Sequence, residues 1–294
     1  MLSLTTMVSL PTFVTTQVDR GVIMALEVRN TTVLVTGASA GLGVEFARRF
    51  AARGANLVLV ARRADRLETL AAEIRSTHSV EVTVLPEDLS VPGVGARLKA
   101  DLDDRGITVG SVVNNAGYGS HGAFSEADPT RMIGEIQLNV GSLAEISRAF
   151  MPDLLAGHGA LVNIASTAAF QPTPGMAVYG ATKAFVLNFT EALWFEARGT
   201  ELTVLAVCPG PTKTEFFDVV GTEDAAVGRM QTAEQVVAAS FSALDRKSPP
   251  PSVVSGVANW VSSISTRMAT RRLGVLISGR ILGNVRMKVS AGRQ

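Results

Sequence analysis

Short apolar runs alternate with longer amphipathic segments between residues 31 and 256. The runs have the length and the Val, Leu and Ile content of buried strands, and they fall at Thr32–Val35, Asn56–Ala61, Glu81–Pro86, Ser111–Asn114, Ala160–Ala165, Leu202–Val207 and Ser252–Ser255. The segments between them predict helices near 42–53, 65–77, 91–105, 129–156, 178–198 and 232–246. Apolar strands separated by helices are typical of a parallel sheet covered on both faces. We therefore predict an α/β fold with a doubly wound, Rossmann-like parallel sheet.

The pattern predicts one domain with two flanking segments. No Pro-, Gly- or Ser-rich linker divides the 294 residues, so we place a single domain at residues 30–256. Residues 1–29 are expected to be a disordered leader or a wrongly assigned start, because Met24 offers a natural start. After residue 256 apolar side chains recur at helical spacing and predict a helical tail over 257–294, at Val257, Trp260, Val261, Ile264, Met268, Leu273, Leu276, Ile277 and Ile281.

Charge is uneven along the chain, although the net charge is only +1. All 26 acidic residues lie at or before Asp245, whereas nine of the 27 Lys and Arg residues follow it. The tail is therefore basic and amphipathic, which suits contact with an anionic membrane or carrier, or a lid over a pocket. Packing of the tail on the acidic domain is the alternative. The basic residues match no nucleic-acid-binding module, so we expect no nucleic-acid partner.

Two further observations limit the chemistry and the location. Cys208 is the single cysteine, and the three histidines show no ligand spacing, so we expect no metal site. The first residues lack the pattern of a secretory signal, and no run of about 20 apolar residues could span a bilayer. We expect a cytoplasmic protein, with peripheral membrane contact through the tail as an additional option.

Tyr179 and Lys183 lie four residues apart in the predicted helix 178–198, and therefore on one helix face. A neighbouring ammonium stabilises a phenolate and lowers the phenol pKa from about 10. We therefore expect Tyr179 to exchange a proton near neutral pH as a general acid–base. Ser166 follows the strand Ala160–Ala165, and a hydroxyl at the carboxyl end of a strand can reach a ligand at the sheet edge.

A glycine-rich turn, residues 36–43 with the sequence TGASAGLG, joins the first predicted strand to the first helix. Its glycines let the backbone approach a pyrophosphate, which binds at the helix N-terminus. The spacing is Gly-x-x-x-Gly-x-Gly, which differs from the commonest dinucleotide pattern, Gly-x-Gly-x-x-Gly. The same residues spell Gly-x-Ser-x-Gly around Ser39, the nucleophile-elbow pattern of hydrolases. A serine hydrolase is therefore an alternative, although no histidine lies in a recognisable loop after one of the last predicted strands.

The end of the second predicted strand indicates which dinucleotide is bound. A site for NAD usually places an acidic residue there, about 20 residues past the glycines, where it binds the ribose 2′-hydroxyl. This chain has Arg62 and Arg63 instead. Two guanidinium groups suit the 2′-phosphate of NADP, with which they form charge-assisted hydrogen bonds. The alternative is that both arginines belong to a solvated helix start.

Taken in order, these motifs resemble the short-chain dehydrogenase/reductase family over about residues 30–256. The glycine-rich turn looks like the family's coenzyme turn, and Asn139 falls where the family carries a helical asparagine. Three more motifs match, namely Asp88-Leu89 for the adenine contact, Asn114-Asn115-Ala116-Gly117 after the fourth strand, and the loop Pro209–Thr214 for the nicotinamide carboxamide. The cofactor-binding residues implied are Gly37, Ser39, Gly41, Leu42, Gly43, Arg62, Arg63, Asp88, Leu89, Asn115, Ala116, Gly117, Tyr179, Lys183, Pro209, Gly210, Thr212 and Thr214.

The resemblance also implies roles for four catalytic residues. Tyr179 would donate a proton to a carbonyl oxygen as hydride arrives, or accept it in the reverse direction. Lys183 would lower the pKa of Tyr179 and bind the nicotinamide ribose, and Ser166 would hold the substrate oxygen. Asn139 would position a water that links Lys183 to solvent.

We therefore expect an NADP(H)-dependent oxidoreductase that interconverts a ketone or aldehyde and an alcohol. The apolar composition and the tail favour a lipid-like, steroid-like or acyl substrate. The alternative is a non-catalytic NADP-binding or membrane-associated protein that keeps the fold. The resemblance further implies a homodimer or homotetramer formed through the helices at 129–156 and 178–198, while the tail could block one such interface.

Overall fold

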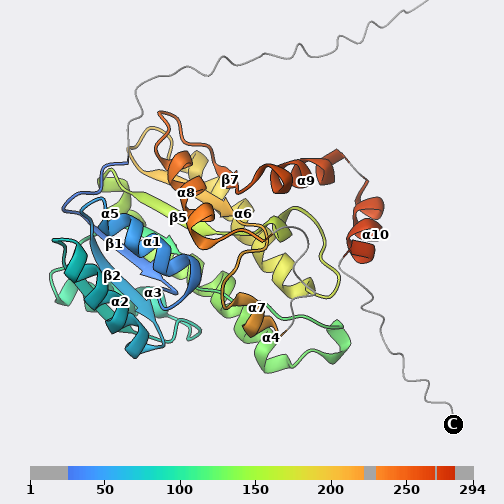
Figure 1. Cartoon of the computed structure of the whole chain (residues 1–294), viewed down its shortest axis with the longest axis horizontal. Coiled ribbons are helices and arrows are strands. Elements are labelled where there is room, and N and C mark those ends of the chain that lie inside the picture. Colours follow the sequence, from blue (N-terminus) through green and yellow to red (C-terminus); the bar gives the residue numbers. More distant parts are fainter. Residues whose placement is uncertain (1–25, 222–229, 269, 282–294) are drawn as a thin grey trace, which may run out of the picture.

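Seven parallel strands form a single sheet in the computed structural model, which describes residues 26–221, 230–268 and 270–281 (Figure 1). The strands lie in the order β3-β2-β1-β4-β5-β6-β7. Their bounds are β1 (Thr32–Thr36), β2 (Asn56–Ala61), β3 (Val82–Pro86), β4 (Val109–Asn114), β5 (Ala160–Ile164), β6 (Thr203–Cys208) and β7 (Ser252–Val254). The order reverses between β1 and β4, and such a switch point is where doubly wound sheets bind ligands.

Helices cover both faces of the sheet (Figure 1). One layer consists of α1 (Gly41–Ala51), α2 (Ala64–Thr77) and α8 (Ala233–Leu244). The other layer consists of α3 (Val94–Asp104), α5 (Leu143–Ala156) and α6 (Ala177–Glu196). Shorter or peripheral elements are α4 (Pro129–Ile136), α7 (Phe216–Val220), α9 (Val257–Met268), α10 (Arg271–Ile281), two 3-10 turns (Phe124–Glu126 and Thr167–Phe170) and a π-helical segment (Gln137–Ser142).

Alternate residues of each strand enter the two core layers, which explains why the strands are apolar throughout. Val33 and Val35 of β1 pack toward α1 and α2, whereas Leu34 packs toward α3 and α5. In the first layer the rings of Phe46, Phe50 and Phe241 meet with centroid separations of 4.9–6.5 Å and tie α1 to α8. The predicted doubly wound sheet is therefore confirmed.

Most predicted elements are present with small shifts of their ends, and two differ more. The predicted helix 129–156 contains the π-helical segment, which separates α4 from α5, and α7 has no counterpart in the prediction. Thr232 and Gln235 form the reciprocal capping box that begins α8. The leader was predicted to extend to residue 29, but Val28 is buried in the core. The folded domain therefore includes residues 26–29.

The tail is helical, as predicted, over α9 and α10, while residues 282–294 lie outside the described part of the chain. Both helices stand at the opposite end of the molecule from α2 (Figure 1). Within the described residues, no helix is both long enough and apolar enough to cross a bilayer.

Candidate active site

A cavity of about 760 Å³ opens at the carboxyl ends of the strands. It extends from the turn after β1 and the end of β2 to the end of β5, the start of α6 and the loop after β6. The motifs that the sequence placed on separate elements therefore line one continuous space.

The glycine-rich turn is held in a tight conformation against the end of β4. Gly37 has φ +65°, and a Cβ there would lie 2.7 Å from the Asn115 side-chain nitrogen. A Cβ on Gly43 would lie equally close to the same atom. The Asn115 amide donates to the carbonyl oxygens of Thr36 and Gly37 at 2.9 and 3.2 Å, which fixes the turn. Only glycine fits where the turn, β4 and α1 meet this closely.

Of the residues predicted to bind the cofactor, all but Gly43 line the cavity. Gly43 is buried behind the turn, where its role is close packing. Asp88 lines the cavity, and its carboxylate accepts hydrogen bonds from the Ser90 amide and hydroxyl at 2.9 and 2.7 Å. These bonds hold the pKa of Asp88 below its usual value and close a turn after β3.

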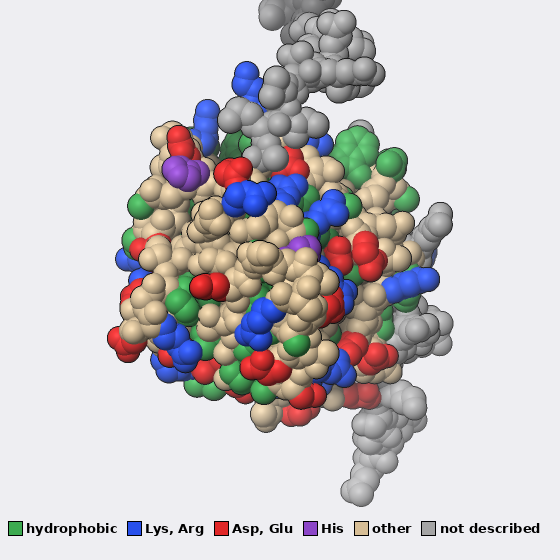
Figure 2. Space-filling model, turned by 60° about the vertical axis from the view of Figure 1, so that its left-hand side comes forward, with side chains coloured by type: hydrophobic (Ala, Val, Ile, Leu, Met, Phe, Trp, Pro, Cys, Tyr) green, Lys and Arg blue, Asp and Glu red, His purple; other side chains and the backbone are tan. Residues whose placement is uncertain are grey.

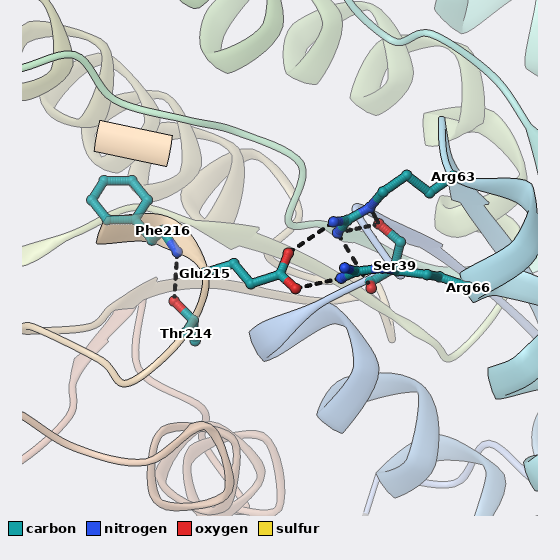
Figure 3. Close-up of polar contacts among 6 residues, drawn as sticks. All are labelled: Ser39, Arg63, Arg66, Thr214, Glu215 and Phe216. Carbon is teal, nitrogen blue, oxygen red and sulfur yellow. Dashed lines mark hydrogen bonds and ion pairs between the residues drawn. The ribbon is translucent and has the colours of Figure 1, made fainter. Parts of the chain in front are cut away.

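The two arginines at the end of β2 have different surroundings. Arg62 is exposed at the cavity edge, whereas Arg63 donates to the Ser39 hydroxyl at 3.0 and 3.2 Å. Arg63 also pairs with Glu215 at 2.8 Å, and Glu215 binds Arg66 of α2 with its other oxygen (Figure 3). Glu215 comes from the segment that follows the loop after β6, so this contact spans the cavity mouth.

Ser166, Tyr179 and Lys183 converge at the other end of the cavity. Ser166 follows β5, and its hydroxyl oxygen accepts from the Ala168 amide at 3.1 Å. Lys183 is buried, donates to the Ile164 carbonyl oxygen at 2.8 Å, and places Nζ 5.8 Å from the centre of the Tyr179 ring. Tyr179 is itself buried beside Phe216, with ring centroids 5.3 Å apart.

The expected lowering of the Tyr179 pKa is not found, and this part of the prediction is wrong for the protein alone. Burial of the phenol raises its pKa to about 12, although the Ser166 hydroxyl acts in the opposite direction. Burial also lowers the pKa of Lys183 to about 8. Desolvation is the largest cause of both shifts because it disfavours each charged form. Tyr179 is therefore a protonated donor near neutral pH.

Asn139 lies in the π-helical segment and does not line the cavity. Its carboxamide exchanges two hydrogen bonds with the Tyr118 backbone, at 2.8 and 3.1 Å, and donates to the Thr182 hydroxyl at 3.1 Å. A Cβ on Gly117 would lie 2.8 Å from Asn139 Oδ1 and 3.5 Å from Lys183 Nζ. Asn139 thus joins the loop after β4 to α6 close to Lys183. The water predicted at Asn139 stays a prediction.

Comparison with known proteins identifies the family. The pattern of the family described as short chain dehydrogenase matches residues 31–225. The chain belongs to the short-chain dehydrogenase family. This assignment explains why the motifs occur in one order along the chain and meet in one cavity.

Individual relatives cover much of this short-chain dehydrogenase. Sulfoacetaldehyde reductase 2 of Chromohalobacter salexigens is 37% identical over 187 residues, which are 63% of this chain and 73% of the relative. A 7β-hydroxysteroid dehydrogenase of Collinsella aerofaciens is 34% identical over 62% of this chain and 68% of its own. The solved short-chain dehydrogenase of Sphingobium yanoikuyae, in complex with NADPH, has a TM-score of 0.71 and 33% identity, covering 90% of this chain and 99% of that one.

The geometry of this dehydrogenase does not favour the hydrolase alternative. The Ser39 hydroxyl accepts from Arg63, which cannot take a proton from a nucleophile. Among the described residues that line the cavity there is no histidine. The Gly-x-Ser-x-Gly pattern is therefore explained by the dinucleotide turn.

Two acidic residues of the dehydrogenase were missed by sequence reasoning. Glu215 lies 152 positions from its partner Arg63, so no local spacing could reveal the pair. Glu135 is fully buried in α4, where its carboxylate faces the Ser120 hydroxyl and backbone. Its position four residues before Asn139, on the same helix face, was the one available signal.

Proposed function

We propose that this short-chain dehydrogenase interconverts a carbonyl compound and an alcohol with NADP(H). The observation that carries the proposal is the convergence of Ser166, Tyr179 and Lys183 on a cavity that begins at the glycine-rich turn. A proton donor, a hydroxyl that can bind an oxygen and a buried cation are the groups that carbonyl reduction requires. When bound, the cofactor supplies or accepts the hydride.

Each of these side chains has a definite task. The Ser166 oxygen accepts from the Ala168 amide, and the Ser166 hydroxyl also acts on the Tyr179 phenol, so it would bind the substrate oxygen beside that phenol. Tyr179, whose pKa of about 12 keeps it protonated, donates the proton to that oxygen. Lys183 holds its ammonium on the Ile164 carbonyl, close beneath the Tyr179 ring, and stabilises the negative charge that develops as the proton leaves.

Support for NADP rather than NAD comes from the arginines at the end of β2. Arg62 and Arg63 both line the cavity, and the end of β2 carries no acidic residue. Arg63 and Ser39 together offer donors at the point where a 2′-phosphate would lie. The relative from Sphingobium yanoikuyae that shares the fold was solved with NADPH, although another, from Burkholderia phymatum, was solved with NAD.

We further propose an apolar substrate. The cavity wall carries Met176 and Phe216 beside Tyr179, together with Phe217 and Val219, and these side chains favour a substrate with a hydrocarbon framework. The relatives include a 7β-hydroxysteroid dehydrogenase and a very-long-chain 3-oxoacyl-CoA reductase, whose names describe such substrates. Ser278 of α10 also lines the cavity, so the tail borders the entrance that a long substrate would use.

Titration with NADPH and NADH, followed by nicotinamide fluorescence, tests the cofactor. We expect NADPH to bind at least about tenfold tighter than NADH, a preference of roughly 1.4 kcal/mol. The double variant Arg62→Ala/Arg63→Ala should abolish this preference for NADPH. Equal affinity for both cofactors would contradict the assignment of the two arginines.

Reduction of a panel of apolar ketones by wild type and Tyr179→Phe tests the chemistry. The variant should lose at least about a hundredfold in kcat, the usual contribution of a positioned proton donor, while still binding NADPH. Unchanged turnover would contradict the role of Tyr179. Tight NADPH binding without turnover of any carbonyl would favour the non-catalytic alternative.

The proposal has three further parts. The tail contacts an anionic membrane, and the protein lies in the cytoplasm at the membrane periphery. The helices α4, α5 and α6 form the interface of a homo-oligomer. Apolar side chains are exposed on the tail helices and on α6. On the face shown in Figure 2 basic and acidic side chains are interspersed, and no patch of one sign forms there.

A further inference from the structure

Glu215 is a carboxylate placed within the proposed 2′-phosphate site. Its two oxygens bind two different arginines, Arg63 at 2.8 Å and Arg66 at a shorter separation (Figure 3). Both arginines come from the β2–α2 junction. Arg63 reaches the Ser39 hydroxyl at the same time, so one guanidinium bridges the coenzyme turn and Glu215.

The chain brings Glu215 there through the loop that follows β6. A Cβ on Gly41 would lie 2.9 Å from the Thr214 methyl group, so this loop lies directly against the glycine-rich turn. The Thr214 hydroxyl accepts from the Phe216 amide at 3.3 Å and closes a tight turn around Glu215. Glu215 is therefore held over the cavity mouth by its neighbours and does not depend on the two ion pairs alone.

The two ion pairs are exchangeable. The side chains of Arg63, Arg66 and Glu215 are 41–45% exposed, and ion pairs in contact with solvent contribute little and are screened by salt. Arginine binds carboxylate and phosphate through the same planar set of donors. A phosphate monoester carries about −1.5 to −2 charges near pH 7, against −1 for a carboxylate, and so is the stronger ligand.

We propose that Glu215 competes with the 2′-phosphate of NADP(H) for Arg63 and Arg66 and thereby sets the preference between NADP(H) and NAD(H). This inference rests on the proposed function, because it assumes that the 2′-phosphate binds at the end of β2. A cofactor without that phosphate leaves the Glu215 pairs intact, whereas NADP(H) must displace Glu215 or bind beside its charge. Glu215 therefore weakens NADP(H) binding selectively and keeps the arginines from binding other anions.

The test compares wild type with Glu215→Gln, which removes the charge and keeps the size. We measure the dissociation constants of NADPH, NADH and 2′,5′-ADP by titration calorimetry at low and at physiological salt. In the variant NADPH and 2′,5′-ADP should bind about three- to tenfold tighter, as expected when two exposed ion pairs no longer compete. NADH should change less than about twofold, and added salt should reduce the gain.

Glu73→Gln is the matched control. Glu73 forms a comparable surface pair with Arg48, at 2.7 Å and with 44% of its side chain exposed, but does not line the cavity. The Glu73→Gln variant should leave the affinities for NADPH, NADH and 2′,5′-ADP unchanged. If Glu215→Gln binds NADPH and 2′,5′-ADP no more tightly than Glu73→Gln, the inference is wrong. If wild type binds none of the three, the proposed function itself fails, so the two failures are distinguishable.

Discussion

Glu135 is a buried carboxyl group beside the proposed catalytic residues. It has no exposed surface, and the polar groups that act on it are Ser120, Arg131 and Lys183. Desolvation outweighs these contacts and raises the pKa of Glu135 above its usual value. The charge of Glu135 in turn raises the pKa of Tyr179 and of Lys183. Glu135 therefore favours protonated forms of both groups.

Replacing Glu135 with Gln should make the protein relatively more stable at high pH. Because the pKa is higher in the folded protein than in the unfolded chain, the folded form binds the proton more tightly. Wild type therefore loses stability as pH rises from the unfolded pKa through the folded one, and the Gln variant does not. We expect the difference in unfolding free energy to shift in favour of the variant between pH 4 and pH 8.

Urea unfolding at several pH values measures this difference. Glu73→Gln provides the opposite sign, because Arg48 holds the pKa of Glu73 below its usual value. That variant should lose a small amount of stability at pH 8 and less as the pH falls through the lowered pKa of Glu73. If the difference in unfolding free energy between wild type and Glu135→Gln did not change with pH, Glu135 would carry the same charge in the folded and the unfolded protein at each pH.

Tyr179 shows what the sequence could and could not predict at this scale. Its spacing to Lys183 correctly placed both residues at one site, because helical periodicity is local. The direction predicted for its pKa shift was wrong, because burial depends on side chains such as Phe216 and Val220 that arrive from α7. The position of both residues at one cavity was therefore predictable, and their electrostatics were not.

Among the elements, the tail helices α9 and α10 also have one feature that the sequence predicted and one that it did not. Their helical spacing was visible in the sequence, but the direction of the apolar side chains was not. The structure leaves apolar side chains exposed on both helices, namely Val257, Trp260, Val261 and Ile264 of α9 and Leu273, Val275, Leu276 and Ile277 of α10. Arg271, Arg272 and Arg280 are exposed on the same pair of helices. Packing on the domain therefore does not account for these side chains.

An anionic lipid bilayer fits this combination, and we expect the protein to sediment with vesicles that contain phosphatidylglycerol. Each arginine near an anionic surface contributes about 1 kcal/mol. Arg271→Gln/Arg272→Gln should therefore weaken binding about tenfold or more. Trp260→Ala should weaken it further, and high salt should act like the arginine variant.

The control changes the same charge elsewhere. Arg75→Gln/Arg105→Gln replaces two exposed arginines of the domain that already face acidic residues. It should leave vesicle binding unchanged. Equal binding of wild type to neutral and anionic vesicles would contradict the role of the basic residues.

For the whole molecule, the sheet was largely predictable because it depends on repeated local patterns. Apolar runs separated by helices imply parallel strands with right-handed crossovers, and seven strands are present in a doubly wound order. The π-helical segment and α7 were not predictable. The first depends on Asn139 and its tertiary partners, and the second is a short turn of helix whose Phe216 packs on Tyr179.

The exposed surface of α6 is the face on which we expect copies of the chain to assemble. This helix is apolar on nearly all sides, which is typical of a buried helix, yet Ala181, Phe185, Ala192 and Phe195 are exposed. Phe185 and Phe195 expose 40% and 63% of their surface, and Ile133 of α4 exposes 59%. An interface built here would bury α6 completely and stiffen the helix that carries Tyr179 and Lys183.

We therefore expect wild type to sediment as a dimer or tetramer and Phe185→Asp/Phe195→Asp to dissociate. In a two-fold interface each substitution occurs twice. Loss of four buried phenylalanines at about 1.5 kcal/mol or more each should raise the dissociation constant at least about a thousandfold. Phe124→Asp, which alters a ring that is 65% exposed on a different element, serves as the control and should not change the mass. A monomeric wild type at micromolar concentration would rule out this interface and leave the apolar face of α6 to another partner.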